Sequence, residues 1–300
     1  MLGLTILGNN SAIPAFNRHP TAQILQDGQQ SYLIDCGEGT QMQMERYKIR
    51  NSKINHIFIS HLHGDHYFGL IGLLTSMALL GRKHTLNLYA TAKLLDIINL
   101  QLEVAAAHLS YELIFHPLLK EGVVLEDKKM QVSCFNVQHR IECWGFLFKE
   151  KKNLRKILPE EVRIHHVPTS FFEKLHEGLD YVNENGETIP NEQLTIAASP
   201  PKSYAYCADT LFDEELGAKV KHVDLLYHET TYLHELQTRA AARFHSTTVE
   251  AATVAAHAEA KKLLIGHFSS MYESLDEFLL EARSVFSNTE LAIEGMCYLI

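Results

Sequence analysis

Short runs of apolar and β-branched residues alternate along the chain with longer segments of helical periodicity. The short runs predict strands at Leu4–Leu7, Tyr32–Ile34, Ile57–Ile59, Leu86–Tyr89, Met130–Val137, Gly145–Phe148, Tyr204–Ala208, Leu225–His228, Leu263–Gly266 and Leu291–Ile293. The longer segments predict helices at Gly69–Leu80, Ala92–Leu109, Thr248–Lys261 and Leu275–Phe286. Strands come in groups and helices flank both halves, so we expect an α/β fold with two sheets sandwiched between helices.

Two of the predicted helix starts carry the pattern of a capping box. Thr247 is followed three residues later by Glu250, and Ser274 by Glu277. In this motif the hydroxyl accepts a hydrogen bond from the third amide of the helix, and the glutamate reaches back to the amide of the cap residue.

The segment from Lys149 to about Ser203 differs from the rest of the chain. It has few long apolar runs, several prolines and the turn signal Asn185-Gly186. We interpret residues 1–300 as a single domain that carries residues 149–203 as an inserted flexible arm, because this segment has too few apolar residues to bury much core of its own.

Composition narrows the class of protein. Of 300 residues, 46% are hydrophobic and 21% charged, which is typical of a globular protein and excludes a disordered or fibrous chain. The net charge of −9 means that any nucleic acid must bind to a local basic patch.

Five cysteines without ligand spacing indicate free thiols. The longest apolar stretch, residues 68–81, is too short to span a membrane, and we expect a cytoplasmic protein.

The 18 histidines suggest chemistry, because imidazole is a common metal ligand and acid–base group. The strongest cluster is His61-Leu62-His63-Gly64-Asp65-His66, directly after the predicted strand Ile57–Ile59. Nitrogen and oxygen ligands without cysteine favour zinc, with manganese or iron as substitutes. Two metals need further ligands, and His139, Asp209 and His267 each follow a predicted strand, where an α/β sheet presents its active site.

These motifs resemble the metallo-β-lactamase superfamily, and within it the chain is similar to the ribonuclease Z family over nearly its whole length. The resemblance rests on residues 8–14 (GNNSAIP), 35–41 (DCGEGTQ), 61–70 (HLHGDHYFGL), 208–210 (ADT), 228–231 (HETT), 245–247 (HST) and 266–270 (GHFSS). It implies a four-layer αββα metallo-β-lactamase sandwich with an extruded arm, the exosite.

The resemblance also implies a ligand set and a reaction. It assigns His61, His63 and His139 to one zinc, Asp65, His66 and His267 to a second, and Asp209 to both. It implies supporting roles for Asp35 and His228. The expected substrate is precursor tRNA, which is cut to leave a 3′-hydroxyl on the tRNA and a 5′-phosphate on the trailer.

Protonation of the leaving oxygen requires an acid. His245 paired with Glu229 suits this role, because a carboxylate orients an imidazole and raises its pKa. Asp65 can also accept a proton from the nucleophile. Ser246 and Thr247 lie at a helix start, where they either hold a phosphate or only cap the helix.

The basic residues Lys149, Lys151, Lys152, Arg155 and Lys156 lie at the base of the predicted arm, together with one acid. The resemblance implies that this arm grips tRNA, and a solvated charged segment is the other interpretation. Arg18 is a further candidate contact for the acceptor end. The resemblance also implies a homodimer. The apolar helix at Leu70–Leu80 is a candidate interface or, equally, part of the core, and no DNA partner is expected.

Two other functions stay open on the sequence. The first is another dinuclear zinc phosphodiesterase or esterase of the same fold that acts on a small substrate, which would need no arm. The second is an RNA chaperone or interaction protein with an inactive site, which would be expected to have lost ligands or the Glu229–His245 pair. Neither is lost here.

Overall fold

The computed structural model describes residues 2–28, 30–151 and 154–300. The larger part of the described chain is built around two seven-stranded sheets. The first has the order β18 (Cys297–Leu299), β1 (Gly3–Gly8), β2 (Ala22–Gln26), β3 (Ser31–Ile34), β4 (Ile54–Phe58), β5 (Leu86–Ala90) and β6 (Leu113–Pro117). The second has the order β17 (Thr289–Leu291), β16 (Lys262–Gly266), β15 (Leu225–Glu229), β14 (Ser203–Cys207), β9 (Trp144–Glu150), β8 (Met130–Asn136) and β7 (Gly122–Glu126).

The sheets pack face to face through aromatic side chains. Phe58 of β4 meets Phe146 and Phe148 of β9 at ring-centroid distances of 5.2 and 5.3 Å. All three rings are fully buried. Edge-to-face contacts of this kind add to the free energy gained by burying apolar area.

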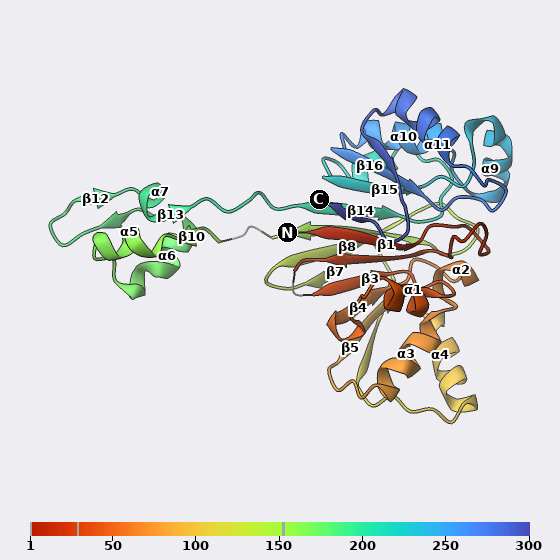
Figure 1. Cartoon of the computed structure of the whole chain (residues 1–300), viewed down its shortest axis with the longest axis horizontal. Helices are drawn as coiled ribbons and strands as arrows, with labels where there is room; N and C mark the ends of the chain where they lie inside the picture. Colours follow the sequence, from red (N-terminus) through yellow and green to blue (C-terminus); the bar gives the residue numbers. More distant parts are fainter. Residues whose placement is uncertain (1, 29, 152–153) are drawn as a thin grey trace. The chain divides into compact units, whose positions relative to one another are not determined.

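Helices cover the outer face of each sheet (Figure 1). Those on the first sheet are α1 (Thr40–Arg46), α2 (Gly64–Tyr67), α3 (Leu70–Leu79) and α4 (Lys93–Val104). Those on the second are α8 (Leu216–Lys219), α9 (Gln237–Arg243), α10 (Thr248–His257) and α11 (Asp276–Val285). Buried apolar residues of α3 and α4 form one core cluster with the first sheet. The predicted α/β four-layer sandwich is confirmed.

Parallel strands in both sheets determine where loops converge. In the first sheet β3, β4 and β5 run parallel, and in the second β14, β15 and β16 run parallel. The carboxyl ends of parallel strands meet at one edge of a sheet, and loops that leave that edge can place side chains close together.

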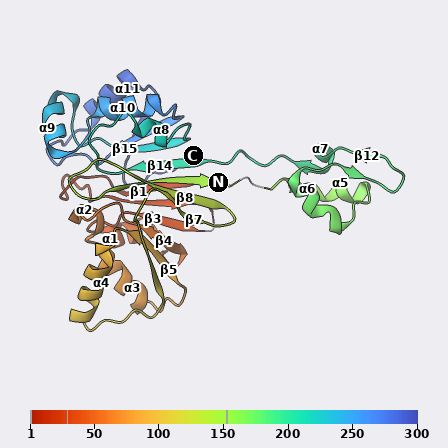
Figure 2. The same ribbon diagram turned by 180° about the vertical axis from the view of Figure 1, so that it is seen from behind.

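The chain divides into two compact units. The second consists of residues 126–131 and 149–201. Its elements are β10 (Lys156–Ile157), α5 (Pro159–Ile164), α6 (Phe172–Glu177), β11 (Tyr181–Val182), β12 (Thr188–Ile189), α7 (Asn191–Leu194) and β13 (Thr195–Ile196); Figure 2 shows them from the other side. This unit has a small core of its own, built from Val162, Val167, Leu175, Tyr181, Ile189 and Leu194. The sequence interpretation of this segment therefore underestimated its capacity to bury apolar side chains.

One of the two predicted capping boxes forms. At the start of α10, Thr247 accepts a hydrogen bond from the amide of Glu250, whose side chain reaches back to the cap amide. The prediction for Ser274 is wrong: its hydroxyl exchanges hydrogen bonds with the backbone and side chain of Asp276. Helix α11 then begins only at Asp276.

Four strands of the sheets were not predicted, namely β2, β6, β7 and β18, and β17 begins two residues earlier than expected. Strands β6, β7 and β18 are sheet edges, and β18 has only three residues. Pairing with a neighbour rather than local periodicity stabilises such strands.

All five cysteines lie in the described part of the chain and are free thiols, as predicted. No helix in the described ranges has the length and apolar character needed to cross a membrane.

Candidate metal centre

The seven predicted ligands come from loops that follow strands of both sheets. His61 and His63 lie in the loop after β4, with Asp65 and His66 in the short helix α2 that continues it. The other three follow single strands: His139 follows β8, Asp209 follows β14 and His267 follows β16. The structure brings all seven together in two adjacent groups.

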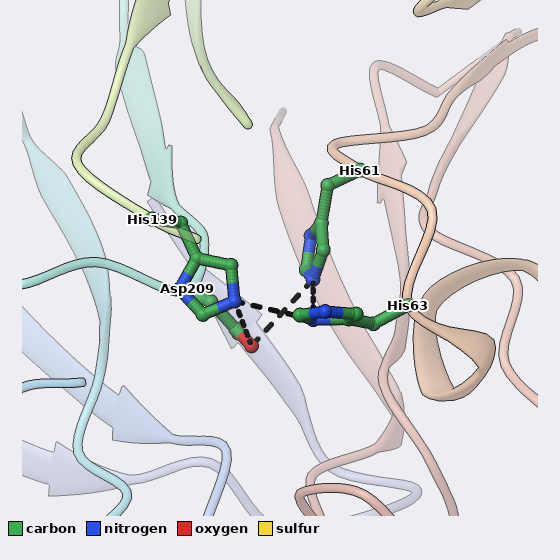
Figure 3. Close-up of side chains that lie close together, drawn as sticks. All are labelled: His61, His63, His139 and Asp209. Carbon is green, nitrogen blue, oxygen red and sulfur yellow. Dashed lines mark hydrogen bonds and ion pairs between the residues drawn. The ribbon is translucent and has the colours of Figure 1, made fainter. Parts of the chain in front are cut away.

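The first group consists of His61, His63, His139 and Asp209 (Figure 3). Nδ1 of His63 lies 3.1 Å from Nε2 of both His61 and His139. Oδ2 of Asp209 lies 3.6 Å from Nε2 of His61 and 3.9 Å from Nε2 of His139. Three ring nitrogens and one carboxylate oxygen therefore point at a common centre.

The second group consists of Asp65, His66 and His267. Nε2 of His66 and Nε2 of His267 lie 3.3 Å apart. Oδ1 of Asp209 lies 3.3 Å from the first of these nitrogens and 3.1 Å from the second. The two oxygens of Asp209 thus face different groups, which suits a carboxylate shared by two cations.

Contacts with neighbouring residues hold five of the ligands in place, and for the four histidines among them these contacts are made by Nδ1, on the side away from the centre. Asp35 accepts a hydrogen bond from Nδ1 of His66 at 2.7 Å. Three more imidazoles are held through Nδ1: that of His61 by Ser60 Oγ at 3.0 Å, that of His139 by Phe244 O at 2.8 Å and that of His267 by Thr231 Oγ1 at 2.9 Å. Oδ2 of Asp65 accepts a hydrogen bond from the Ala12 amide at 2.7 Å. Such contacts fix the tautomer and direction of a metal-binding imidazole.

The protonation of the two groups suits a divalent cation. Burial and neighbouring imidazoles hold the pKa of His61 well below its usual range, so its ring is neutral. Burial opposes ionisation of Asp209, but the neighbouring histidines outweigh it and hold its pKa well below the usual range. Burial also disfavours the charged form of His66, yet Asp209, Asp65 and Asp35 raise its pKa. A cation bound next to Asp209 and Asp65 would displace the proton of His66, because a metal binds the deprotonated form of its ligands.

The donor set suits divalent metal ions. Imidazole nitrogens and carboxylate oxygens, with no thiolate among them, are borderline to hard ligands that zinc accepts readily. Oδ1 of Asp209 is buried and accepts no hydrogen bond from any residue in the described ranges. A buried carboxylate oxygen without a hydrogen-bond partner is costly, and a bound cation would satisfy it.

Glu229 and His245 form an ion pair beside the two groups. Oε1 of Glu229 lies 2.9 Å from Nδ1 of His245, and Glu229 is fully buried. Burial lowers the pKa of His245, but Glu229, Asp209 and Asp65 outweigh it and raise that pKa to about 9. Nε2 of His245 has no hydrogen-bond partner in the part of the chain that the structure describes.

A cavity of about 470 Å³ opens onto the centre. His63, Asp65, Asp209 and His245 line it. So does Arg140, whose exposed side chain makes no hydrogen bond or ion pair within the described ranges. We did not single out Arg140 from the sequence, although its place next to His139 could have drawn attention to it.

The structure does not support a direct substrate contact for several predicted residues. Arg18 is nearly buried, and its guanidinium donates to Asn10 Oδ1 at 2.9 Å and to the backbone oxygens of Tyr272 and Glu273. The buried hydroxyl of Ser246 donates to the backbone oxygen of Thr210, and that of Thr247 caps α10. Helix capping therefore accounts for Thr247, whereas the Ser246 hydroxyl is used by a backbone oxygen outside the helix.

The remaining predicted residues have mixed surroundings. Among the basic residues, Lys149 and Lys156 are exposed, Lys151 forms an ion pair with Glu126, Arg155 donates to Thr195 Oγ1, and Lys152 lies outside the described residues. His228 is buried and its Nδ1 contacts the backbone oxygen of Glu229, not a predicted ligand.

Comparison with known proteins places this chain in a family. Residues 2–282 match the family model described as Anti-Pycsar protein Apyc1. The chain is 42% identical over 296 residues to a ribonuclease Z of Bacteroides fragilis, covering 98% of this chain and 97% of that protein. The structure of human tRNase Z, short form, is similar with a TM-score of 0.74 and 25% identity over 99% of both chains.

A further structure, the metallo-β-lactamase fold protein YhfI from Bacillus subtilis, aligns over all of both chains with a TM-score of 0.71 and 18% identity. At that identity it shows the fold alone. The chain therefore belongs to the family that the matching model describes and to the ribonuclease Z family, and it has the metallo-β-lactamase fold.

Proposed function

We propose that the chain is a zinc-dependent endoribonuclease that removes the 3′ trailer from precursor tRNA. The observation that carries this proposal is the pair of ligand groups bridged by Asp209, with the Glu229–His245 pair beside them, in a chain 42% identical to a ribonuclease Z. The products would be a tRNA with a 3′-hydroxyl and a trailer with a 5′-phosphate.

We assign His61, His63 and His139 to one zinc and Asp65, His66 and His267 to a second, with Asp209 shared. Bound zinc ions would supply Lewis-acid stabilisation of the charge that develops on the phosphodiester and a supply of hydroxide at neutral pH. Asp65 is held ionised, because neighbouring histidines lower its pKa despite burial, so it is available to accept a hydrogen bond or proton from an attacking water.

His245 would protonate the leaving 3′ oxygen through Nε2. Its Nδ1 is engaged by Glu229, so Nε2 is the nitrogen that remains for the substrate. At neutral pH a group whose pKa is raised to about 9 is protonated and can act as the acid. His245 lines the cavity, and the residue is 9% exposed, so the proton reaches the cavity without crossing protein.

We further propose that residues 149–203 bind tRNA away from the cut, through exposed lysines such as Lys149 and Lys156. The proposal includes a homodimer in the cytoplasm, with a single catalytic domain in each subunit and without DNA as a partner. The acidic total charge of −9 supports RNA binding through a local patch rather than through the whole surface.

A small phosphodiester is the alternative substrate, and the matching family model carries the name of a protein other than ribonuclease Z. The experiment compares zinc-loaded protein on a precursor tRNA and on bis(p-nitrophenyl) phosphate. Efficient cleavage of the precursor at the junction of tRNA and trailer supports the proposal. Turnover of the small ester with an intact precursor would favour the alternative.

Removal of the arm should separate tRNA recognition from chemistry. Replacing residues 154–200 by a short Gly/Ser linker keeps β9, which ends at Glu150, and β14, which begins at Ser203. We expect a loss of on the order of 100-fold or more in kcat/KM for precursor tRNA, because Lys156 and the folded part of the arm are removed, and little change for the small ester. Parallel loss of both activities would instead show that the arm is structural.

Arg140 should contact the substrate backbone, because its exposed guanidinium lines the same cavity as Asp209 and His245. We expect Arg140→Ala to raise KM for precursor tRNA by roughly tenfold or more, the value of one charge-assisted hydrogen bond. Metal content should not change. Arg50→Ala is the matched control, since Arg50 is also exposed but lines a different cavity. An unchanged KM in Arg140→Ala would refute this contact.

A further inference from the structure

The hydroxyl of Thr231 lies between the catalytic-pair residue Glu229 and the metal-ligand candidate His267. Thr231 Oγ1 lies 2.7 Å from Oε2 of Glu229 and 2.9 Å from Nδ1 of His267. All three residues are buried. Thr231 is the last residue of the motif at residues 228–231, and the sequence alone gives it no separate role.

The direction of these hydrogen bonds follows from the atoms involved. Histidine neighbours outweigh burial and lower the pKa of Glu229, so its carboxylate is ionised and can only accept. Thr231 has one hydroxyl proton, which it donates to Oε2 of Glu229. Its oxygen lone pairs then accept from Nδ1–H of His267 at 2.9 Å, and Nδ1 of His245 lies 3.1 Å from the same oxygen. This leaves the lone pair on Nε2 of His267 directed at the centre, 3.1 Å from Oδ1 of Asp209.

The backbone conformation of His267 indicates that contacts with other residues hold its side chain in place. His267 has a φ of 62°, in the left-handed region that residues with a side chain seldom adopt. A side chain carried by a backbone in this region persists when surrounding contacts determine its position. The bond to Thr231 is the one that acts on the ring nitrogen facing away from the centre.

A second acid in the structure has the same arrangement. Asp35 receives Nδ1 of His66 directly at 2.7 Å, and it reaches His61 through the hydroxyl of Ser60, at 2.9 Å and then 3.0 Å. In each case one buried carboxylate orients one imidazole directly and a second through a hydroxyl. In each case the backbone amide of the hydroxyl residue also donates to the same carboxylate.

We infer that Thr231 is a positioning residue through which Glu229 orients His267, so that Glu229 supports the second metal site as well as the proton donor His245. This inference rests on the proposed metal centre, to which it adds a residue and a second role for Glu229. It assigns to Thr231 a contribution to metal affinity that is independent of RNA binding.

The test measures metal binding in the full-length protein. Thr231→Val removes the hydroxyl while nearly keeping the side-chain volume, and Thr231→Ser restores it. Thr230→Val is the matched control, because the neighbouring Thr230 is equally buried and its hydroxyl donates to the backbone oxygen of Gly266 instead. Zinc content is determined by mass spectrometry after dialysis against a graded series of chelator concentrations.

We expect Thr231→Val to lose one of two zinc ions at a chelator concentration roughly 10 to 100-fold lower than the wild type. Thr231→Ser and Thr230→Val should release zinc as the wild type does. Wild-type zinc retention in Thr231→Val, or an equal loss in Thr230→Val or in Thr231→Ser, would overturn the inference. Failure of the wild-type protein to cut precursor tRNA, with the zinc pattern as expected, would instead count against the proposed function alone.

Discussion

Asp209→Asn is expected to reduce kcat/KM on precursor tRNA by on the order of 1,000-fold or more and to lower the zinc content of the protein. Its two oxygens face different ligand groups, at 3.6 Å from His61 and 3.1 Å from His267, and the substitution leaves one weak oxygen ligand in place of a shared anion. A loss of about 1,000-fold in kcat/KM corresponds to several kcal/mol of transition-state stabilisation, which is the size of effect that bound metals supply. Zinc analysis and steady-state kinetics on the same preparation measure both effects.

The matched control is Asp276→Asn, which makes the same chemical change at an exposed position in the first turn of α11. It should retain both zinc ions and wild-type activity. Asp209→Asn with two tightly bound zinc ions and full activity would contradict the shared role that we assign to Asp209.

His245→Ala is expected to lower kcat by about 10²- to 10⁴-fold, the usual contribution of a positioned general acid. The zinc content should stay at the wild-type level, and this readout decides between two roles. His245 also lies in a possible ligand group with Asp209 and His267. Loss of a zinc ion from His245→Ala would show that His245 is a ligand rather than the proton donor.

The Glu229–His245 pair also predicts a pH effect. The acid form of His245 is lost as the pH rises through its pKa, which Glu229 helps to raise to about 9 despite burial. Glu229→Gln removes the negative charge 2.9 Å from Nδ1, so the pKa falls. The alkaline limb of the pH–rate profile should therefore move to lower pH in this variant. A limb at the wild-type position would exclude His245 as the titrating acid.

The metal ligands could be predicted because they are local in sequence or lie at strand ends. His61, His63, Asp65 and His66 fall within six residues, and their density alone indicates a metal loop. His139, Asp209 and His267 could be proposed because each follows a recognisable strand, and the parallel order of β14, β15 and β16 brings the strand ends before Asp209 and His267 together.

The roles of Arg18 and Thr231 could not be predicted, because they depend on tertiary contacts of polar groups. Arg18 is a cation in a loop, and only the fold shows that its guanidinium is used by Asn10 and by two backbone oxygens. Thr231 is one of several threonines, and its role follows from the placement of β15 beside β16. Sequence periodicity carries no information about such hydrogen-bond partners, because they are set by residues far apart in the chain.

The same limit applies to the arm. Its six-residue core is made of apolar side chains scattered among prolines and charges, so it gave no periodic signal. The run of basic residues from Lys149 to Lys156, in contrast, did predict a contact with tRNA. The structure then shows that Lys151 is paired with Glu126, while Lys149 and Lys156 are exposed.

The proposed cleavage is tested by determining both RNA ends that the zinc-loaded protein creates in a precursor tRNA. We expect a tRNA that ends in a 3′-hydroxyl, shown by ligation to a 5′-phosphorylated adaptor, and a trailer that begins with a 5′-phosphate. A 2′,3′-cyclic phosphate on the tRNA, or the absence of any cut near the 3′ end of the tRNA, would contradict it.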